Sequence, residues 1–303
     1  MTLMLIDAAN LYFRAFYAIP DSVRTPDGRP INAVRGFLDM SAMLIDKRRP
    51  SRWVACLDLD WRPSFRVELV PTYKAHRVAR DGSEEVPDLL EPQIPVLLDV
   101  LTALGLACAG AEGFEADDVM ATLAARDADR VEVVTGDRDM LALATDRVTV
   151  LYAGKGIAKL EDMTPEAVQA KYGVPAEHYA DFAVLRGDPS DGLPGVKGVG
   201  EKTAAALVSR FGAIEDIVAA AQAGDDGFPA GAASKVRAAL DYLAAAPAAV
   251  RGRTDAPVDE VDDELPAKPR DADKLARLSE ELGIENSVNR IRTAIDAALA
   301  APR

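Results

Sequence analysis

Three carboxylates stand within four residues in the stretch 113–119, Gly-Phe-Glu-Ala-Asp-Asp-Val. Glu115 and Asp118 are three residues apart, so they share a face if the segment is helical, whereas Asp117 points elsewhere. Negative charges packed so closely repel one another unless cations offset them. Hard cations such as Mg²⁺ and Mn²⁺ prefer oxygen ligands, so the stretch indicates a metal site. The alternative is a solvated acidic first turn that complements a helix dipole.

More acids stand where predicted strands end, or in loops. The apolar runs 3–6, 53–57 and 131–134 predict short buried strands, and residues 187–192 predict a loop. The acids at these places are Asp7, Asp58, Asp137, Asp139, Asp188 and Asp191. Because ligands bind outside the carboxyl ends of the strands in an open α/β sheet, acids far apart in the chain can converge on one edge. Such a cluster suits two or more Mg²⁺ or Mn²⁺ ions that hold a phosphodiester and its attacking water.

The overall composition limits the classes of partner. The chain has 303 residues and a formal net charge of −14, which argues against indiscriminate binding of nucleic acid but leaves room for a local basic track or for metal ions. Cys56 and Cys108 lie in apolar, strand-like contexts, so we expect reduced core residues. The apolar run 1–6 has no basic lead, and no segment reaches membrane-spanning length. We therefore expect a cytoplasmic protein with no membrane partner. As a separate expectation, the chain acts as a monomer.

Strands and helices alternate in the first half of the chain. Helical spacing covers residues 8–17, 33–47, 89–104 and 119–126, and further short strands are predicted at 106–109 and 148–151. This order predicts an α/β fold with a mostly parallel sheet and helices on both faces. Later segments are helical at 179–186, 204–210 and 274–300, with 246–271 extended over the surface. We expect a catalytic core at 1–160 and a helical region with a C-terminal extension at 161–303.

A glycine-rich stretch opens one of the later helices. Its glycines would let backbone N–H groups approach a phosphate, with a helix N-terminus behind them. The stretch resembles a nucleotide P-loop, but Lys202 falls one residue late, which excludes ATP binding. A hairpin between two helices that grips a DNA backbone fits better, and an ordinary glycine-rich turn is the alternative. The residues concerned are Gly195, Lys197, Gly198, Gly200, Lys202 and Thr203.

The most basic part of the chain is the stretch 62–80. A base could stack on Tyr73 while Lys74, Arg77 and Arg80 meet phosphates. The same stretch supplies a cation that could neutralise a scissile phosphate in the transition state. A solvated basic face is the alternative.

Together these motifs resemble the 5′-nuclease domain of bacterial DNA polymerase I and the wider flap endonuclease family. The matching segments are residues 5–8 with Arg14 seven residues after Asp7, and residues 63–66, 73–77, 113–119, 135–139 and 187–203. They follow the family order from residue 5 to about residue 210, and residues 250–258 look like its closing segment. No polymerase follows, so we expect a free-standing 5′-nuclease of the bacterial type.

The resemblance implies a PIN-like fold with a helical arch at about 70–92 and a helix-three-turn-helix at about 186–212. It implies that Lys74 and Arg77 act on the scissile phosphate at the base of the arch, with Arg14 nearby, and that the hairpin holds duplex DNA, with a K⁺ ion there. The implied metal acids are Asp7, Asp58, Glu115, Asp117, Asp118, Asp137, Asp139, Asp188 and Asp191.

Two positions depart from the family pattern. The family places an acid seven residues before Arg66, where this chain has Leu59, so Asp58 is our preferred ligand and Asp60 stays open. Gly192 stands where the family commonly has Asn. We expect a 5′-flap endonuclease and 5′→3′ exonuclease that acts on flaps, nicks and duplex ends in DNA replication and repair. The alternatives are a PIN-like ribonuclease and a non-catalytic, structure-specific DNA-binding protein.

Overall fold

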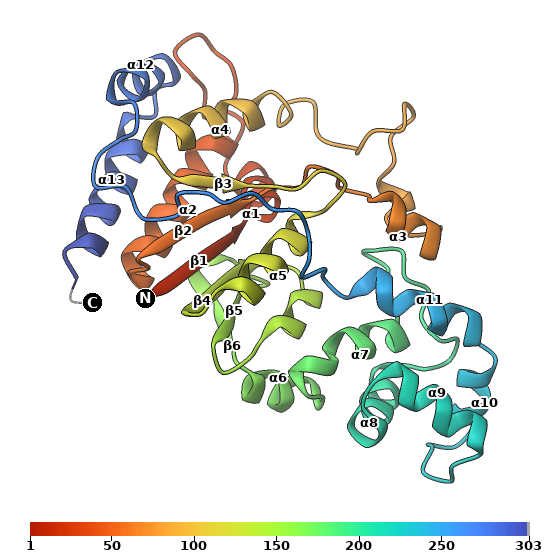
Figure 1. The fold of residues 1–303 in the computed structure, drawn as a ribbon. Helices are drawn as coiled ribbons and strands as arrows, with labels where there is room; N and C mark the ends of the chain where they lie inside the picture. Colours follow the sequence, from red (N-terminus) through yellow and green to blue (C-terminus); the bar gives the residue numbers. More distant parts are fainter. Residues whose placement is uncertain (302–303) are drawn as a thin grey trace.

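A six-stranded sheet forms the centre of the molecule in the computed structural model, which describes residues 1–301 (Figure 1). The strand order is β3-β2-β1-β4-β5-β6. The strands are β1 (Thr2–Asp7), β2 (Arg52–Cys56), β3 (Ala107–Ala109), β4 (Arg130–Thr135), β5 (Val148–Tyr152) and β6 (Glu161–Met163). Every neighbouring pair is parallel except β5 with β6, so the predicted mostly parallel sheet is confirmed.

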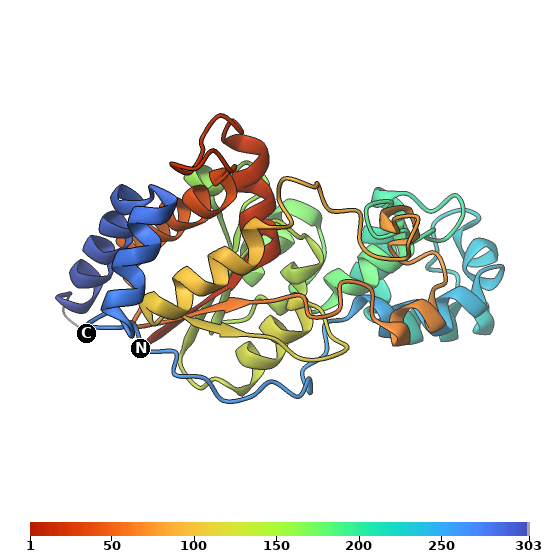
Figure 2. The ribbon, with the colours of Figure 1, turned by 90° about the horizontal axis from the view of Figure 1, so that it is seen from above.

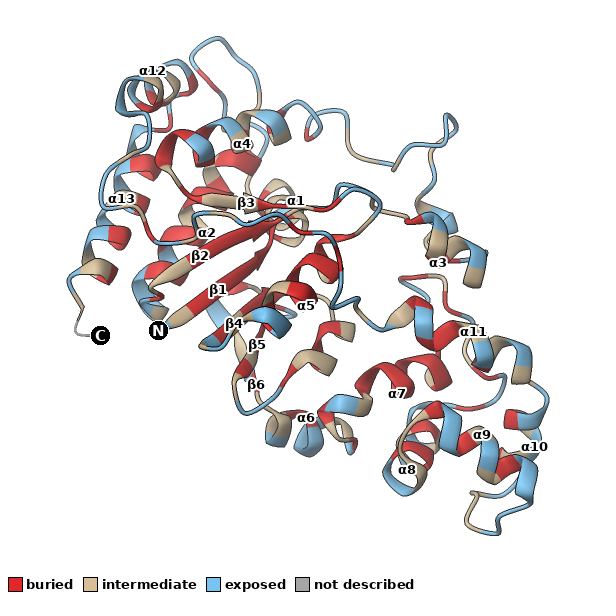
Figure 3. Ribbon diagram, viewed as in Figure 1, coloured by how far each residue is buried: buried red, intermediate tan, exposed pale blue. Residues whose placement is uncertain are grey.

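Helices cover both faces of this sheet. They are α1 (Ala8–Ala18), α2 (Asn32–Arg48), α4 (Gln93–Leu104) and α5 (Ala116–Arg126), with α12 (Ala272–Leu282) and α13 (Glu285–Leu299) from the C-terminal part. Alternate residues of a strand point to opposite faces, and accordingly Leu3 and Leu5 enter one hydrophobic core while Met4 and Ile6 enter the other. The central strands are therefore buried on both sides (Figure 3).

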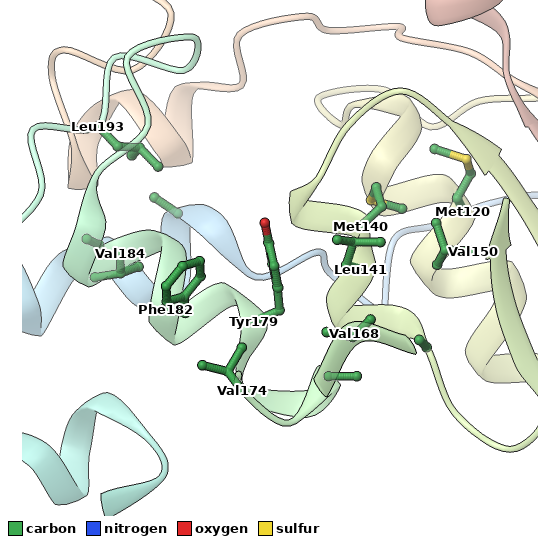
Figure 4. Close-up of a cluster of buried hydrophobic side chains, with 14 of the residues drawn as sticks. Met120, Met140, Leu141, Val150, Val168, Val174, Tyr179, Phe182, Val184 and Leu193 are labelled. Carbon is green, nitrogen blue, oxygen red and sulfur yellow. The ribbon is translucent and has the colours of Figure 1, made fainter. Parts of the chain in front are cut away.

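A helical region extends from one end of the sheet (Figure 2). It contains α6 (Pro165–Tyr172), α7 (Tyr179–Arg186), α8 (Glu201–Phe211), α9 (Ile214–Ala223), α10 (Ala232–Arg237) and α11 (Leu240–Val250). The short helix α3 (Ser64–Leu69) packs beside α11. Side chains such as Met120, Leu141, Tyr179 and Phe182 form a continuous buried cluster from the sheet into this region (Figure 4). Burial of this apolar surface fixes the helical region against the sheet.

The segment 70–92, expected as a helical arch, is irregular. Its only helical part is the 3₁₀ turn η1 (Ala75–Arg77). A tight turn at Gly82 follows, closed by the hydrogen bond from the Ala79 N–H to the Ser83 carbonyl at 2.8 Å. Proline, glycine and clustered charges disfavour a helix in this segment. The expectation that the arch is helical is therefore wrong.

Other boundaries also differ from the sequence-based expectation. Helix α5 begins three residues earlier than predicted, so Asp117 and Asp118 lie in its first turn. Helices α9 to α11 and the strand β6 were not predicted. The extended segment begins after Val250 and returns to the sheet, where the Trp53 N–H donates to the Asp263 carbonyl at 2.7 Å. The remaining 3₁₀ turns are η2 (Asp139–Leu143), η3 (Ile157–Lys159) and η4 (Ala176–His178).

The two C-terminal helices pack beside the sheet rather than on the helical region. Helix α13 lies along α2, and α12 lies along α4 (Figure 1). The chain thus leaves the sheet after β6, forms the helical region, and comes back. The division predicted at residue 160 precedes β6, the last strand of the sheet.

Candidate active site

A cavity of about 830 Å³ lies at the carboxyl edge of the parallel strands. Its basic lining comes from α1, from the segment 70–92 and from the turn after β4. The charged residues that line it are Asp7, Asp58, Glu84, Glu115, Asp117, Asp137, Asp188, Arg14, Lys74, Arg77 and Arg138. Six of the nine predicted metal acids therefore share one cavity with all three of the basic side chains that were predicted to be catalytic, Arg14, Lys74 and Arg77. The argument from strand ends anticipated this convergence.

Asp7 ends β1 and also begins the next helix. One carboxylate oxygen accepts the Asn10 N–H at 2.9 Å and caps α1. The other accepts the Thr135 hydroxyl at 2.7 Å, which ties the end of β1 to the end of β4. These two bonds fix the direction of the carboxylate toward the cavity.

Asp58, rather than Asp60, faces the cavity. Its Oδ1 accepts the backbone N–H of Ala116 at 2.7 Å, so the acid sits at the N-terminus of α5, where the helix dipole favours negative charge. Asp60 instead accepts the Arg62 N–H at 3.1 Å and does not line the cavity. The structure thus favours Asp58 in the choice that the sequence left open.

Arg66 organises the acidic stretch, and the sequence analysis gave it no role. It is buried and donates to both oxygens of Asp118 at 2.7 Å, to Glu115 Oε2 at 2.6 Å and to the Ala249 carbonyl at 2.8 Å. Asp118 also accepts the Arg253 N–H at 2.9 Å and lies outside the cavity. Among the nine predicted metal acids, Asp118 is the one that lines neither this cavity nor the small neighbouring one, and Arg66 engages both of its carboxylate oxygens. The Pro-Ser-Phe-Arg motif was the available signal for Arg66.

Lys74 and Arg77 enter the cavity from the segment 70–92. The Lys74 ammonium donates to Glu115 Oε1. Burial alone would lower the pKa of this ammonium, but Glu115 and the acids around it hold the pKa above its usual value. Arg77 donates to the Ser190 carbonyl at 2.7 Å and to Asp191 at 3.3 Å. Both cations thus lie directly beside acids of the candidate site.

Tyr73 is not a stacking platform in this structure, which corrects the expectation from the sequence. The side chain is buried, with 5% of the residue exposed, and its hydroxyl donates to Glu115 Oε2 at 2.8 Å. Its ring packs in the core because the hydroxyl finds a buried acceptor there. Arg80, three residues after the end of the 3₁₀ turn at Arg77, is exposed and lies outside the cavity.

The acids after β4 and in the loop after α7 line two cavities. Asp137 and Asp188 line the large one, while Asp139 and Asp191 line a small neighbouring cavity of about 20 Å³, which Asp117 also lines. Asp188 accepts bonds from Arg138 and from Arg186, both at 3.1 Å. In contrast, Asp139 Oδ1 is buried without a hydrogen-bond partner, which is costly for a carboxylate oxygen.

The electrostatics of the site show a deficit of positive charge. Burial, with added repulsion from Asp58, raises the pKa of Asp7 to about 7. Burial and Asp137 raise the pKa of Asp191 to about 7, and they raise the pKa values of Asp117 and Asp139 well above the usual range. Within residues 1–301, no three acidic, histidine or cysteine side chains are arranged tightly enough to hold a metal ion by themselves. The carboxylates are instead spread over the cavity walls.

The glycine-rich hairpin joins α7 to α8. The backbone at Gly187 passes close to the backbone at Gly195. A Cβ built on Gly195 would lie only 2.6 Å from the Gly187 nitrogen. Buried Val196 and Val199 anchor the turn. The predicted DNA contacts Lys197, Gly198, Gly200 and Lys202 are exposed, and Thr203 is partly buried. Gly200 is the N-cap of α8, so the N-terminus of that helix faces solvent beside the turn.

Two family models match the chain in succession. A model described as the 5′-3′ exonuclease N-terminal resolvase-like domain matches residues 2–173, and one described as the 5′-3′ exonuclease C-terminal SAM fold matches residues 174–294. None of the helices within residues 1–301 is long and apolar enough to cross a membrane.

Curated relatives agree with these models. A 5′-3′ exonuclease of Mycobacterium tuberculosis is 49% identical over 97% of this chain and 98% of its own length. A 5′-3′ exonuclease of Streptomyces coelicolor is 48% identical over 97% of this chain and 100% of its own length. DNA polymerase I of Mycobacterium tuberculosis is 42% identical over 93% of this chain, which corresponds to 30% of the polymerase.

Solved structures with the same fold include two nucleases. The bacteriophage T5 flap endonuclease, in a pseudo-enzyme-product complex with DNA and metal ions, has a TM-score of 0.64 at 17% identity and covers 99% of this chain and 100% of its own. The catalytic core of Rad2 with a DNA substrate has a TM-score of 0.60 at 16% identity and covers 97% of this chain and 92% of its own. These likenesses confirm the expected PIN-like α/β core followed by a helical region.

Proposed function

Because this chain belongs to the 5′-3′ exonuclease family, we propose that its acid-lined cavity hydrolyses phosphodiesters at 5′ ends and 5′-flap junctions of duplex DNA. The observation that carries the proposal is the meeting of six of the predicted metal acids with Arg14, Lys74 and Arg77 in one cavity of about 830 Å³. Carboxylates can hold cations, and the three basic side chains can together neutralise the charge of a phosphate. The role in replication and repair follows from the family.

The donor set of the cavity fits Mg²⁺ or Mn²⁺. All the donors are oxygens. The pKa values of Asp7 and Asp117 are raised by burial and then by repulsion from neighbouring acids, and divalent cations would relieve that repulsion. The spread of the carboxylates leaves room for ions that keep part of their water shell, as Mg²⁺ commonly does. We propose as holding residues Asp7, Asp58, Glu115, Asp117, Asp137 and Asp188, with Asp139 and Asp191 behind them. Two such ions, when bound, would stabilise the attacking and leaving oxygens of an in-line displacement.

Asp118 has a different proposed role. Its carboxylate is fully engaged by Arg66 and by the Arg253 N–H, so we assign it to positioning. By holding Arg66, it fixes the cation that also contacts Glu115. Glu115 is thereby held at the cavity wall beside Lys74.

The three basic side chains of the cavity would contact the phosphate from two sides. Arg14 lies on α1 and lines the cavity, and its buried Nε has no acceptor within residues 1–301, so the guanidinium is not tied to the protein through this donor. Lys74 and Arg77 come from the segment 70–92 and rest on acids and a carbonyl in the absence of substrate. A phosphate bound between the two sets would accept donors from both, which orients it for attack.

The hairpin after α7 is the proposed grip on duplex DNA. Its exposed turn offers backbone N–H groups and the N-terminus of α8 to phosphates, with Lys197 and Lys202 on either side. Gly195, Gly198, Gly200 and Thr203 complete the proposed contact set, together with Arg80 on the segment 70–92. We further propose that a single copy of the chain acts on DNA.

The deciding experiment is cleavage of an end-labelled 5′-flap duplex in Mg²⁺, in Mn²⁺ and in chelator. The matched variants are Asp58→Asn, which changes an acid of the cavity, and Asp60→Asn, which changes an acid outside it. We expect cuts near the flap junction with either metal, loss of cutting in chelator and in Asp58→Asn, and cutting by Asp60→Asn close to wild type.

Two other outcomes would reject this proposal. Tight junction binding without cutting in any metal would identify a non-catalytic DNA-binding protein. Preferential cutting of RNA in a parallel panel of RNA and DNA substrates would identify a ribonuclease. Loss of cutting in Asp60→Asn but not in Asp58→Asn would reverse the assignment of the two acids.

A further inference from the structure

Helix α10 places a lysine over the glycine-rich hairpin. The Lys235 ammonium donates to the carbonyl of Gly198 at 2.8 Å. A Cβ built on Gly198 would lie 3.3 Å from both Nζ and Cε of Lys235, so the side chain lies against the turn. The next residue, Val236, is fully buried and holds α10 in place. The ammonium is thus positioned by the fold and does not extend freely into solvent.

Lys235 is free of acidic partners. Within the residues that the structure describes, no carboxylate lies within ion-pair distance of its ammonium, and its hydrogen bond is to the Gly198 carbonyl. An ammonium has three N–H donors, so two remain after the bond to the carbonyl. Lys197 and Gly198 of the turn are exposed, and Lys235 itself is partly exposed.

The charge of the Lys235 ammonium lies at the hairpin that is proposed to bind duplex DNA. Backbone N–H groups and the N-terminus of α8 carry only partial positive charges, and the chain has a net charge of −14, which repels DNA at long range. A cation bound to a carbonyl of the same turn would add a full charge beside the phosphate. Because its position is already fixed, little side-chain entropy is lost when DNA binds.

We propose that the Lys235 ammonium is a built-in cation of the hairpin, which bridges the Gly198 carbonyl and a phosphate of duplex DNA. This proposal rests on the proposed function of the hairpin as the duplex grip. An ammonium and a K⁺ ion carry the same charge, and carbonyl oxygens can satisfy either. A K⁺ ion on the Gly198 carbonyl would have to displace the ammonium or share the oxygen with it. The ammonium thus takes the place at this carbonyl that the K⁺ ion expected from the resemblance would otherwise occupy, and the proposal implies that DNA binding by this chain does not require K⁺.

The test is the affinity of the full chain for a blunt duplex in chelator, where cleavage does not occur. Fluorescence anisotropy is measured in NaCl and in KCl at equal ionic strength for wild type, Lys235→Ala, Lys235→Arg and Lys202→Ala. Lys202 is an exposed lysine in the first turn of α8 and serves as the matched control.

We expect wild type and Lys235→Arg to bind equally in the two salts. Lys235→Ala should bind about tenfold more weakly in NaCl, with a salt slope reduced by about 0.9, and should recover part of the loss in KCl because K⁺ can occupy the vacated carbonyl. Lys202→Ala should lose affinity equally in both salts.

Three results would overturn the proposal. They are K⁺-dependent binding by wild type, unchanged affinity of Lys235→Ala, and a loss in Lys235→Ala that KCl does not relieve. The last would make Lys235 an ordinary phosphate contact. If wild type fails to bind duplex DNA in either salt, the proposed grip itself is wrong, so the two failures are distinguishable.

Discussion

Arg66 and Asp118 form a buried bidentate ion pair outside the acid-lined cavity, with Nη1 and Nη2 each 2.7 Å from a carboxylate oxygen. Only 2% of Arg66 and none of Asp118 is exposed. The same guanidinium donates to Glu115 and to the carbonyl of Ala249 at the end of α11. One buried cation therefore joins the start of α5, the candidate site and the helical region.

We expect Asp118→Ala to destabilise the fold strongly. Removing one partner leaves the buried guanidinium uncompensated, which typically costs about 3–5 kcal/mol. Urea unfolding at pH 7 in chelator measures the loss. Asp137→Asn is the control, because it removes a charge from the cavity and should unfold at the same or a higher urea concentration. An Asp118→Ala protein as stable as wild type, yet inactive, would instead place Asp118 among the residues that act directly in the site.

Lys74→Ala and Arg77→Ala should slow the chemical step far more than they weaken DNA binding. Both cations line the cavity, and loss of one donor to a developing charge typically costs about 10²–10³ in rate. Single-turnover cleavage of a 5′-flap duplex gives the rate, and anisotropy gives the affinity. Arg80→Ala, on the same segment but outside the cavity, should mainly reduce affinity. A loss confined to affinity in the first two variants would make them simple phosphate contacts.

The sequence predicted the convergence of the acids because the ends of the strands can be recognised from the apolar runs. Apolar runs end at Asp7 and just before Asp58, and parallel strands share one carboxyl edge. It did not predict which acids face the cavity. That depends on where α5 starts, and the start at Ala116 turns Asp118 toward Arg66. A shift of three residues moves a side chain around most of a helical turn.

The parts of the structure that the sequence did not predict either have a weak hydrophobic periodicity or depend on contacts between residues far apart in the chain. Helix α9 contains the run Val218–Ala223, whose small residues give little contrast between faces. The strand β6 has only three residues, two of them acidic, and forms because it pairs with β5. Tyr73 stands among basic residues in the sequence, yet it is buried because Glu115, far away in the chain, accepts its hydroxyl. Such contacts are set by the fold and leave no local pattern.

In chelator, the free energy of unfolding should fall as the pH rises from about 4 to about 7. The pKa of Asp7 is raised from 3.8 to about 7 in the folded state, and that of Asp191 is raised likewise. The folded state therefore holds these protons more tightly, so their contribution to stability is present at low pH and is lost as the pH passes the folded-state value. Each group contributes a slope of at most about 1.4 kcal/mol per pH unit.

Divalent cations should reverse this loss, because they bind the deprotonated carboxylates of the native state. Thermal unfolding at pH 5 and pH 8, in chelator and in Mn²⁺ or Mg²⁺, measures both effects. The metal-dependent rise in Tm should be larger at pH 8. Asp7→Asn keeps the cap on α1 and should show a shallower pH dependence in chelator. Equal melting temperatures with and without metal at pH 8 would argue against cation binding in the cavity.

The segment 70–92 is anchored to the candidate site at Gly192, and this contact gives the last prediction. Gly192 has a φ of +71°, and a Cβ there would collide with the carbonyl oxygen of Thr72. Beside this contact, the Thr72 hydroxyl donates to the Gly192 carbonyl at 2.7 Å, and the Lys74 N–H donates to the Asp191 carbonyl at 2.9 Å. Gly192→Ala must push Thr72 away and shift Lys74.

We expect Gly192→Ala to lower the single-turnover cleavage rate by roughly 10²-fold, since displacements of about 1 Å in a positioning element have effects of that size. Gly173→Ala is the control. Gly173 has a φ of +73° but nothing within 4 Å of a built Cβ, so this variant incurs only the left-handed backbone cost of about 1–2 kcal/mol. Gly192→Asn separates the two causes, because Asn tolerates the left-handed region but still carries a Cβ. If Gly192→Asn cleaves like wild type, the close approach of Thr72 does not position Lys74, and only the backbone conformation at residue 192 matters.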